Sequence, residues 1–322
     1  MRYYELMILA ALAAFAATNT IVSLWSALTW KKVADTKWTP LARARVLLAL
    51  RLAPAAVGAL GSALASMAFL RYEPRSTSEA PSSLLLTGAV VGGGIVMVGI
   101  WRGVKRLCET ARFMASIERT GAPVAVHGAH MPAWRVDTTF PLVAVAGILR
   151  SRLLIAGTVL AELPEEELEL VVRHELAHAR YHDNVAQLLM IAAPDAVSAC
   201  GWSRPLERAW RQAAEEAADD GAVGGDANAR LHLASALLRV ARLLGEQTPP
   251  RLPVPAFHEG ASIEKRVRRL LTVNEPPLVT PQASLLALAT CACFAGAVVV
   301  AQWDALLSGV YTAIEWAVNM RP

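Results

Sequence analysis

The sequence predicts a mainly α-helical membrane protein, with four transmembrane helices and a cytoplasmic helical domain that contains a small β-sheet. The chain of 322 residues is 55% hydrophobic and only 18% charged, which is too apolar for an ordinary soluble protein. Four apolar runs are long enough to cross a bilayer. Between the third and fourth runs, about 180 residues combine short apolar strands with amphipathic helices, which is the size of one domain.

Three of the spans belong to an N-terminal membrane domain, residues 1–101. They are predicted at about 6–30, 52–70 and 84–100. The first run is longer than the apolar core of a signal peptide, so we expect it to be retained in the protein.

The fourth span is predicted at about 285–301, within a C-terminal segment that comprises residues 282–322. The tail after this span is apolar but short, and Asp304 and Glu315 interrupt it. Its tryptophan and tyrosine residues favour an amphipathic helix at the membrane surface over a fifth span.

Basic residues cluster after the first span and again after the third. The positive-inside rule places both clusters in the cytoplasm and the N-terminus outside. The domain at residues 102–281 is then cytoplasmic, and the protein is a multi-pass protein of the plasma membrane. The basic residues, which give the chain a net charge of +4, fit lipid headgroups. The lipid bilayer is therefore an expected partner, and direct nucleic-acid binding is not expected.

The cytoplasmic domain begins with four candidate strands, at residues 124–126, 134–136, 142–146 and 153–155. A long helix is predicted from Pro164 to about Asp183, because proline and the acidic residues after it suit a first helical turn. Further helices are predicted at residues 185–200, 205–222, 230–245 and 262–273. The basic residues of the last helix are most simply explained as a solvated or membrane-facing surface.

The long helix carries the motif His174-Glu175-Leu176-Ala177-His178. Two histidines four residues apart lie on one face of a helix, one turn apart, so both can bind a single Zn²⁺. Glu175 is then placed to take a proton from zinc-activated water. The alternative is a pair of surface histidines, which the apolar stripe on the same helix disfavours.

A zinc hydrolase needs a third protein ligand, and the predicted helix at residues 205–222 carries an acidic cluster. Glu215 and Asp219 are four residues apart and share a face of that helix. We expect Glu215 to bind the metal and Asp219 to accept a hydrogen bond from a ligand histidine. Glu216 and Asp220 have the same spacing, so this register remains an alternative.

The ligand set predicts one zinc ion per chain and hydrolysis with zinc-activated water as the nucleophile. Glu175 acts as the general base and later protonates the leaving amine. A further donor should stabilise the oxyanion. His258, His182 and Arg266 are the candidates, and the sequence does not rank them.

The motif, followed by Arg180, Asp183 and Asn184, resembles the gluzincin site of the BlaR/MecR-type integral-membrane metallopeptidases. The segment from Glu215 to Asp220 resembles the second motif of that family. The resemblance covers about residues 120–275, and it implies a helical zincin-type domain whose sheet edge can hold a peptide. Residues 142–146 are the candidates for that edge. The HtpX and CAAX-prenyl-protease type shares both motifs and is the nearest alternative.

The resemblance implies an integral-membrane zinc metalloendopeptidase that acts on protein or peptide substrates. Antibiotic-sensing members carry a large extracellular domain after their last span, and this chain ends about 20 residues after its own. Sensing of β-lactams is therefore not expected. A cytoplasmic site permits a transcriptional repressor as a substrate, but regulatory proteolysis and HtpX-like membrane quality control both remain open. A non-catalytic membrane sensor or scaffold is the main alternative, and the intact motif disfavours it.

Overall fold

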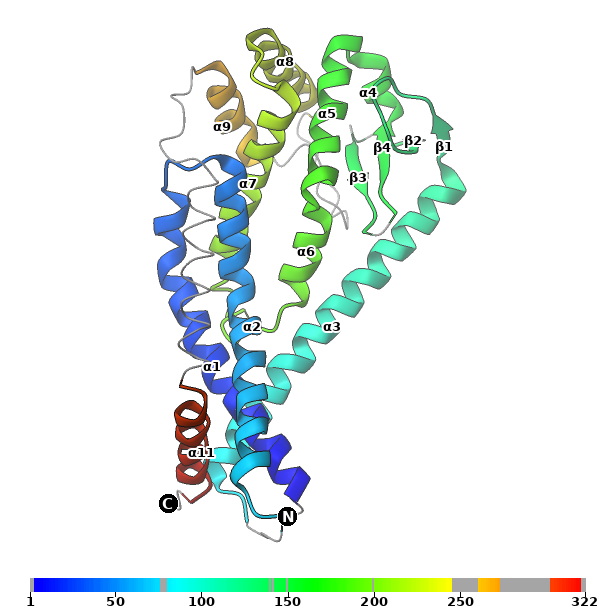
Figure 1. Ribbon diagram of the computed structural model, residues 1–322. Helices are drawn as coiled ribbons and strands as arrows, with labels where there is room; N and C mark the ends of the chain where they lie inside the picture. Colours follow the sequence, from blue (N-terminus) through cyan, green and yellow to red (C-terminus); the bar gives the residue numbers. More distant parts are fainter. Residues whose placement is uncertain are drawn as a thin grey trace.

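The computed structural model describes residues 3–75, 80–138, 140, 142–148, 150–198, 200–244, 260–272 and 302–319. In these residues the protein is mainly helical, with one small sheet (Figure 1). The predicted fourth span at residues 285–301 and the candidate His258 lie outside the described residues.

Three N-terminal helices are long and apolar enough to cross a membrane, as predicted: α1 (Tyr3–Ala34), α2 (Pro40–Tyr72) and α3 (Ser83–Thr120). Each extends beyond its apolar run. Helix α3 has 38 residues, so it is about 57 Å long, whereas a bilayer core is about 30 Å thick. Its second half leads away from α1 and α2 to the sheet (Figure 1).

The tail forms the predicted helix, α11 (Trp303–Asn319). It packs against the end of the α1–α2–α3 bundle near the N-terminus, where Ile314 and Val318 join a buried cluster with Phe69 (Figure 1). The Tyr311 hydroxyl donates a hydrogen bond of 2.9 Å to Glu73. The tail helix is thus fixed to the bundle, while its place at the membrane surface stays a prediction.

The four predicted strands are present, with boundaries shifted by at most two residues: β1 (Ala122–Val124), β2 (Ala133–Val136), β3 (Val143–Ala146) and β4 (Arg152–Ala156). The strand order is β1-β2-β4-β3, and β3 pairs antiparallel to β4. All four residues of β3 are buried although it is an edge strand of this sheet. Other elements therefore cover its outer side.

Between the sheet and α11, the described residues form the helices α4 (Gly157–Glu162), α5 (Glu165–Tyr181), α6 (Asp183–Ala192), α7 (Arg204–Val223), α8 (Ala227–Leu244) and α9 (Gly260–Leu271). The long predicted helix ends at Tyr181 because His182 adopts a left-handed conformation, with φ 59° and ψ 37°. The next helix then starts at Asp183 in a new direction. The helix predicted at residues 185–200 is shorter than expected and ends at Ala192.

The connection between α6 and α7 reaches into the bundle of apolar helices, a contact that the sequence did not predict. The Asn19 side chain of α1 donates to the Pro194 carbonyl and accepts from the Ala196 amide, at 3.0 Å each. The buried Arg51 of α2 pairs with Asp195 at 3.3 Å and with Glu207 at 2.9 Å. These polar contacts fix the start of α7 to α1 and α2.

Candidate metal centre

Three potential metal ligands converge between α5 and α7. His174 and His178 lie one turn apart on α5, and their Nε2 atoms are 3.1 Å apart. Glu215 of α7 places one carboxylate oxygen 3.5 Å from His174 Nε2 and the other 3.8 Å from His178 Nε2. All three side chains are buried, and one ligand atom of each lies within 4.8 Å of the others.

Two further carboxylates orient the histidines. Asp219, predicted for such a role, lies 3.0 Å from Nδ1 of His174. Asp183 lies 2.6 Å from Nδ1 of His178. With each Nδ1 held by a carboxylate, each Nε2 is directed to the shared centre, an arrangement common around ligand histidines. The sequence did not predict this role for Asp183. Asp183 follows the helix break at His182, and the direction of its side chain depends on that break.

A buried arginine joins α9 to the same centre. The guanidinium of Arg266 contacts Asp219 through Nε at 2.9 Å and Nη2 at 2.7 Å. Its Nη1 lies 2.9 Å from Glu215. Among the predicted oxyanion candidates, the structure therefore brings Arg266 to the site. His182 is exposed at the end of α5 and makes no contact with this cluster in the described part of the chain.

The model of the family described as BlaR1 peptidase M56 matches residues 6–270, which include most of α1, all of α2 and α3, and the candidate centre. The chain belongs to the BlaR1 peptidase M56 family. This confirms the predicted resemblance to the BlaR/MecR-type membrane metallopeptidases, and a peptidase of this kind acts on protein substrates. No curated protein matches the sequence significantly.

The donor set of this M56 chain fits a metal ion. Two imidazole nitrogens and one carboxylate are the ligands that catalytic zinc sites use, with a fourth position left for water. Beside them, Glu175 Oε1 is buried and has no hydrogen-bond partner among the described residues. An orphaned buried carboxylate oxygen next to three potential ligands is consistent with a site that a water molecule completes.

The contacts of the acidic cluster on α7 show which pair of its residues faces the histidines. Glu215 and Asp219 face the histidines of α5. Glu216 instead pairs with Arg43 of α2, and Asp220 pairs with Arg269 of α9. The interpretation of the basic α9 surface as solvated is therefore wrong for Arg266 and Arg269, because both bind carboxylates of α7.

Electrostatics at the candidate centre keep the carboxylates of Glu215 and Asp219 ionised. Burial raises the pKa of Glu215, but Arg266 and the two histidines outweigh it and lower the pKa to about 2. The pKa of Asp219 is also lowered, because Arg266 and His174 outweigh its burial. Burial lowers the pKa of His178, but Asp183 and Glu215 outweigh it and raise the pKa to about 9.

Glu175 differs from the other carboxylates. Burial raises its pKa more than His178 and His174 lower it. A carboxylate with a raised pKa has a higher proton affinity and is better suited to general-base work near neutral pH.

The edge strand β3 is tied to this centre by its backbone. The Val145 amide donates a hydrogen bond of 2.9 Å to Glu175 Oε2. The Asn184 side chain donates to the carbonyl oxygens of Val145, at 2.9 Å, and Gly147, at 3.0 Å. These bonds cover the edge at residues 142–146 that was predicted to hold a peptide. A substrate strand that pairs with Val145 would have to open them.

Proposed function

We propose that this chain is an integral-membrane zinc metalloendopeptidase that hydrolyses peptide bonds of protein substrates. The observation that carries the proposal is the convergence of His174, His178 and Glu215 within 4.8 Å, beside Glu175. Membership of a peptidase family supports the same reaction class. A non-catalytic sensor or scaffold would have no need for this buried and mutually oriented set.

His174, His178 and Glu215 would hold the zinc ion and leave one position open. Zinc bound there supplies Lewis-acid chemistry, which activates water and polarises the scissile carbonyl. Asp183 and Asp219 keep the two imidazole rings in the orientation that presents Nε2 to the ion.

Glu175 acts as the general base. Its Oε2 atom accepts the hydrogen bond from the Val145 amide, which fixes the carboxylate in place. Its Oε1 atom has no partner among the described residues, so this oxygen takes the proton from the attacking water. The same oxygen then delivers the proton to the leaving amine.

We assign Arg266 a positioning role rather than oxyanion stabilisation. Its Nε, Nη1 and Nη2 atoms all contact the carboxylates of Asp219 and Glu215. A guanidinium with its donors directed to those two groups holds the ligand carboxylate and the partner of His174 together.

We further propose that the protein lies in the plasma membrane with its N-terminus outside and its catalytic domain, residues 102–281, in the cytoplasm. The basic residues after α1 and along the second half of α3 support this orientation. Residues 1–101 and 282–322 form the membrane parts, with the bilayer as partner. A cytoplasmic site permits regulatory proteolysis, and a transcriptional repressor is one permitted substrate.

Removal of the metal tests the proposed activity. We expect the detergent-purified protein to hold about one zinc ion per chain and to cleave casein or itself. A chelator should abolish cleavage, and added zinc should restore it. A well-folded protein that holds no zinc and is unaffected by the chelator would contradict the proposal and favour a sensor or scaffold.

Asp183, which is hydrogen-bonded to Nδ1 of His178, gives a second test of the metal centre. We expect Asp183→Asn to lower zinc affinity by about 10–100-fold, because the amide orients the imidazole less strongly than a carboxylate does. Zinc affinity is measured by competition with a chelator of known affinity. Asp220→Asn is the matched control, since Asp220 binds Arg269 and no histidine. Equal affinity in the two variants would refute the role of Asp183.

A further inference from the structure

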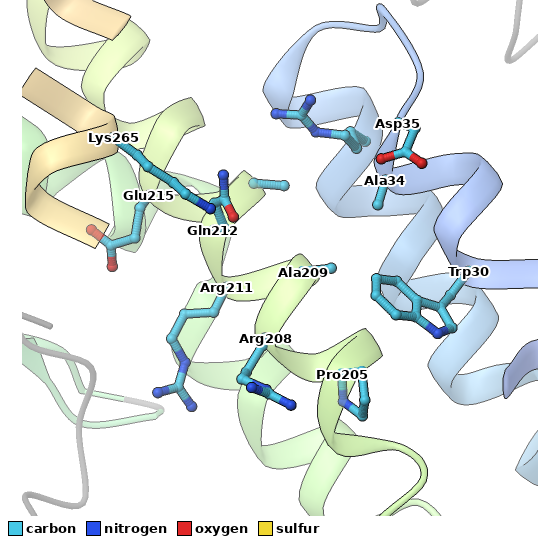
Figure 2. A pocket seen from close by; sticks show the side chains of 12 residues that line it. Trp30, Ala34, Asp35, Pro205, Arg208, Ala209, Arg211, Gln212, Glu215 and Lys265 are labelled. Carbon is cyan, nitrogen blue, oxygen red and sulfur yellow. The ribbon is translucent and has the colours of Figure 1, made fainter. Parts of the chain in front are cut away.

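A cavity of about 680 Å³ opens between the end of α1, the start of α2, and helices α7 and α9 (Figure 2). Trp30 and Asp35 line it on one side. Arg208 and Arg211 of α7 and Lys265 of α9 line the other side. Its volume is within the range of sites that bind small ligands or several side chains of a peptide.

This cavity adjoins the candidate metal centre at Glu215. Glu215, whose carboxylate lies between the two histidines, is also one of the cavity residues. Arg211 and Arg208 precede it by four and seven residues, so they lie one and two turns away on the same face of α7 (Figure 2). A molecule in the cavity would therefore lie beside Glu215, one of the three candidate metal ligands.

The cavity walls carry an excess of positive charge. Two of the charged wall residues are neutralised, since Arg43 pairs with Glu216 and Glu215 pairs with Arg266. Asp35 is the remaining acid, and Arg208 and Lys265 are bases that also line the cavity.

The remaining bases are not all balanced by acids within the protein. In the part of the chain that the structure describes, neither Arg208 nor Lys265 forms an ion pair with a carboxylate. Arg211 also lies close enough to Arg106 of α3 for the two like charges to repel each other. An anionic occupant would relieve this excess charge.

We propose that this cavity binds an acidic segment of the protein substrate and directs cleavage to peptide bonds near aspartate or glutamate residues. The proposal rests on the endopeptidase function proposed above. Complementary charge mainly determines which partner binds and how fast it associates. An anionic lipid headgroup carries the same charge, but the presence of Glu215 in the wall favours an occupant that reaches the metal centre.

Binding is measured with the full-length Glu175→Gln protein in an uncharged detergent, so that peptides are bound without being cut. The probes are two labelled peptides that are identical except that glutamines replace the glutamates in one of them. We expect tighter binding of the acidic peptide, and a loss on the order of tenfold when Arg208→Glu and Lys265→Glu are combined. Affinity for the neutral peptide should stay unchanged, which shows that the fold is intact.

Arg268→Glu is the matched control, because Arg268 lies on α9 but is exposed and paired with Glu264. It should keep the preference for the acidic peptide. High ionic strength should remove the preference, since exposed charges are screened. Equal binding of both peptides by the parent protein would overturn the proposal.

Cleavage separates this proposal from the function on which it rests. The wild-type protein is given a proteome-derived peptide library, and we expect acidic residues to be enriched near the cut sites. Cleavage without such enrichment overturns the cavity proposal and leaves the peptidase intact. Absence of any cleavage overturns the peptidase, while the binding measurement still decides the cavity.

A lipid site would give a different result. In that case activity or thermal stability would depend on phosphatidylglycerol rather than phosphatidylcholine in nanodiscs, and the double charge reversal would remove this dependence. The two peptides would then bind equally, and the proposal would be overturned.

Discussion

Glu175→Gln is expected to abolish peptide hydrolysis and to leave zinc binding intact. The glutamine has nearly the same shape, and its amide oxygen can still accept the hydrogen bond from Val145. It cannot take a proton from water, and loss of general-base catalysis costs about 10²–10⁴-fold in rate. Casein cleavage and zinc content are measured on the same preparation, so that the two effects are separated.

Glu169→Gln is the matched control for this variant. Glu169 lies on the same helix, but it is near the surface and pairs with Arg173. We expect it to retain both zinc and activity. Full activity in Glu175→Gln would show that another group is the base. Loss of zinc from Glu175→Gln would instead show that Glu175 maintains the structure of the centre.

Glu215→Ala is expected to lose its zinc. Glu215 is the carboxylate that lies within 3.8 Å of both Nε2 atoms, and its removal leaves only two protein ligands. We expect zinc affinity to fall by more than the roughly 10–100-fold that is typical when a residue hydrogen-bonded to a metal ligand is removed. Zinc per chain is measured by elemental analysis after gel filtration in detergent.

The adjacent residue provides the control. Glu216→Ala removes the same side chain one position along α7, where it pairs with Arg43 and not with the histidines. It should keep its zinc. The opposite pattern, with zinc retained by Glu215→Ala and lost by Glu216→Ala, would mean that the ligand register is shifted by one residue.

Structural features that depend only on neighbouring residues in the sequence could be predicted without the structure. Apolar runs about 20 residues long predicted the three N-terminal helices, and the structure confirms them as candidate spans. Short apolar segments between glycine and proline residues predicted the four strands. The pairing of His174 with His178 on one face follows directly from the helical repeat, because residues four apart are always neighbours.

Features that depend on distant contacts were decided by the tertiary structure. The break at His182 directs Asp183 back to His178, although the sequence predicted one uninterrupted helix. The spacing of the acids on α7 allowed two registers, and the packing of α7 between α5 and α2 separates them. A local repeat cannot show which face of a helix meets which neighbour.

The sequence by itself predicted the three long apolar helices and the four strands. It also predicted that His174 and His178 share one helix face with Glu175 beside them. Only the tertiary structure brought Arg266 into the centre and placed the α6–α7 connection against Asn19 and Arg51. The physical reason is the range of the interactions. Backbone geometry fixes neighbours within one or two turns, whereas a buried ion pair joins residues whose positions depend on the packing of the whole chain.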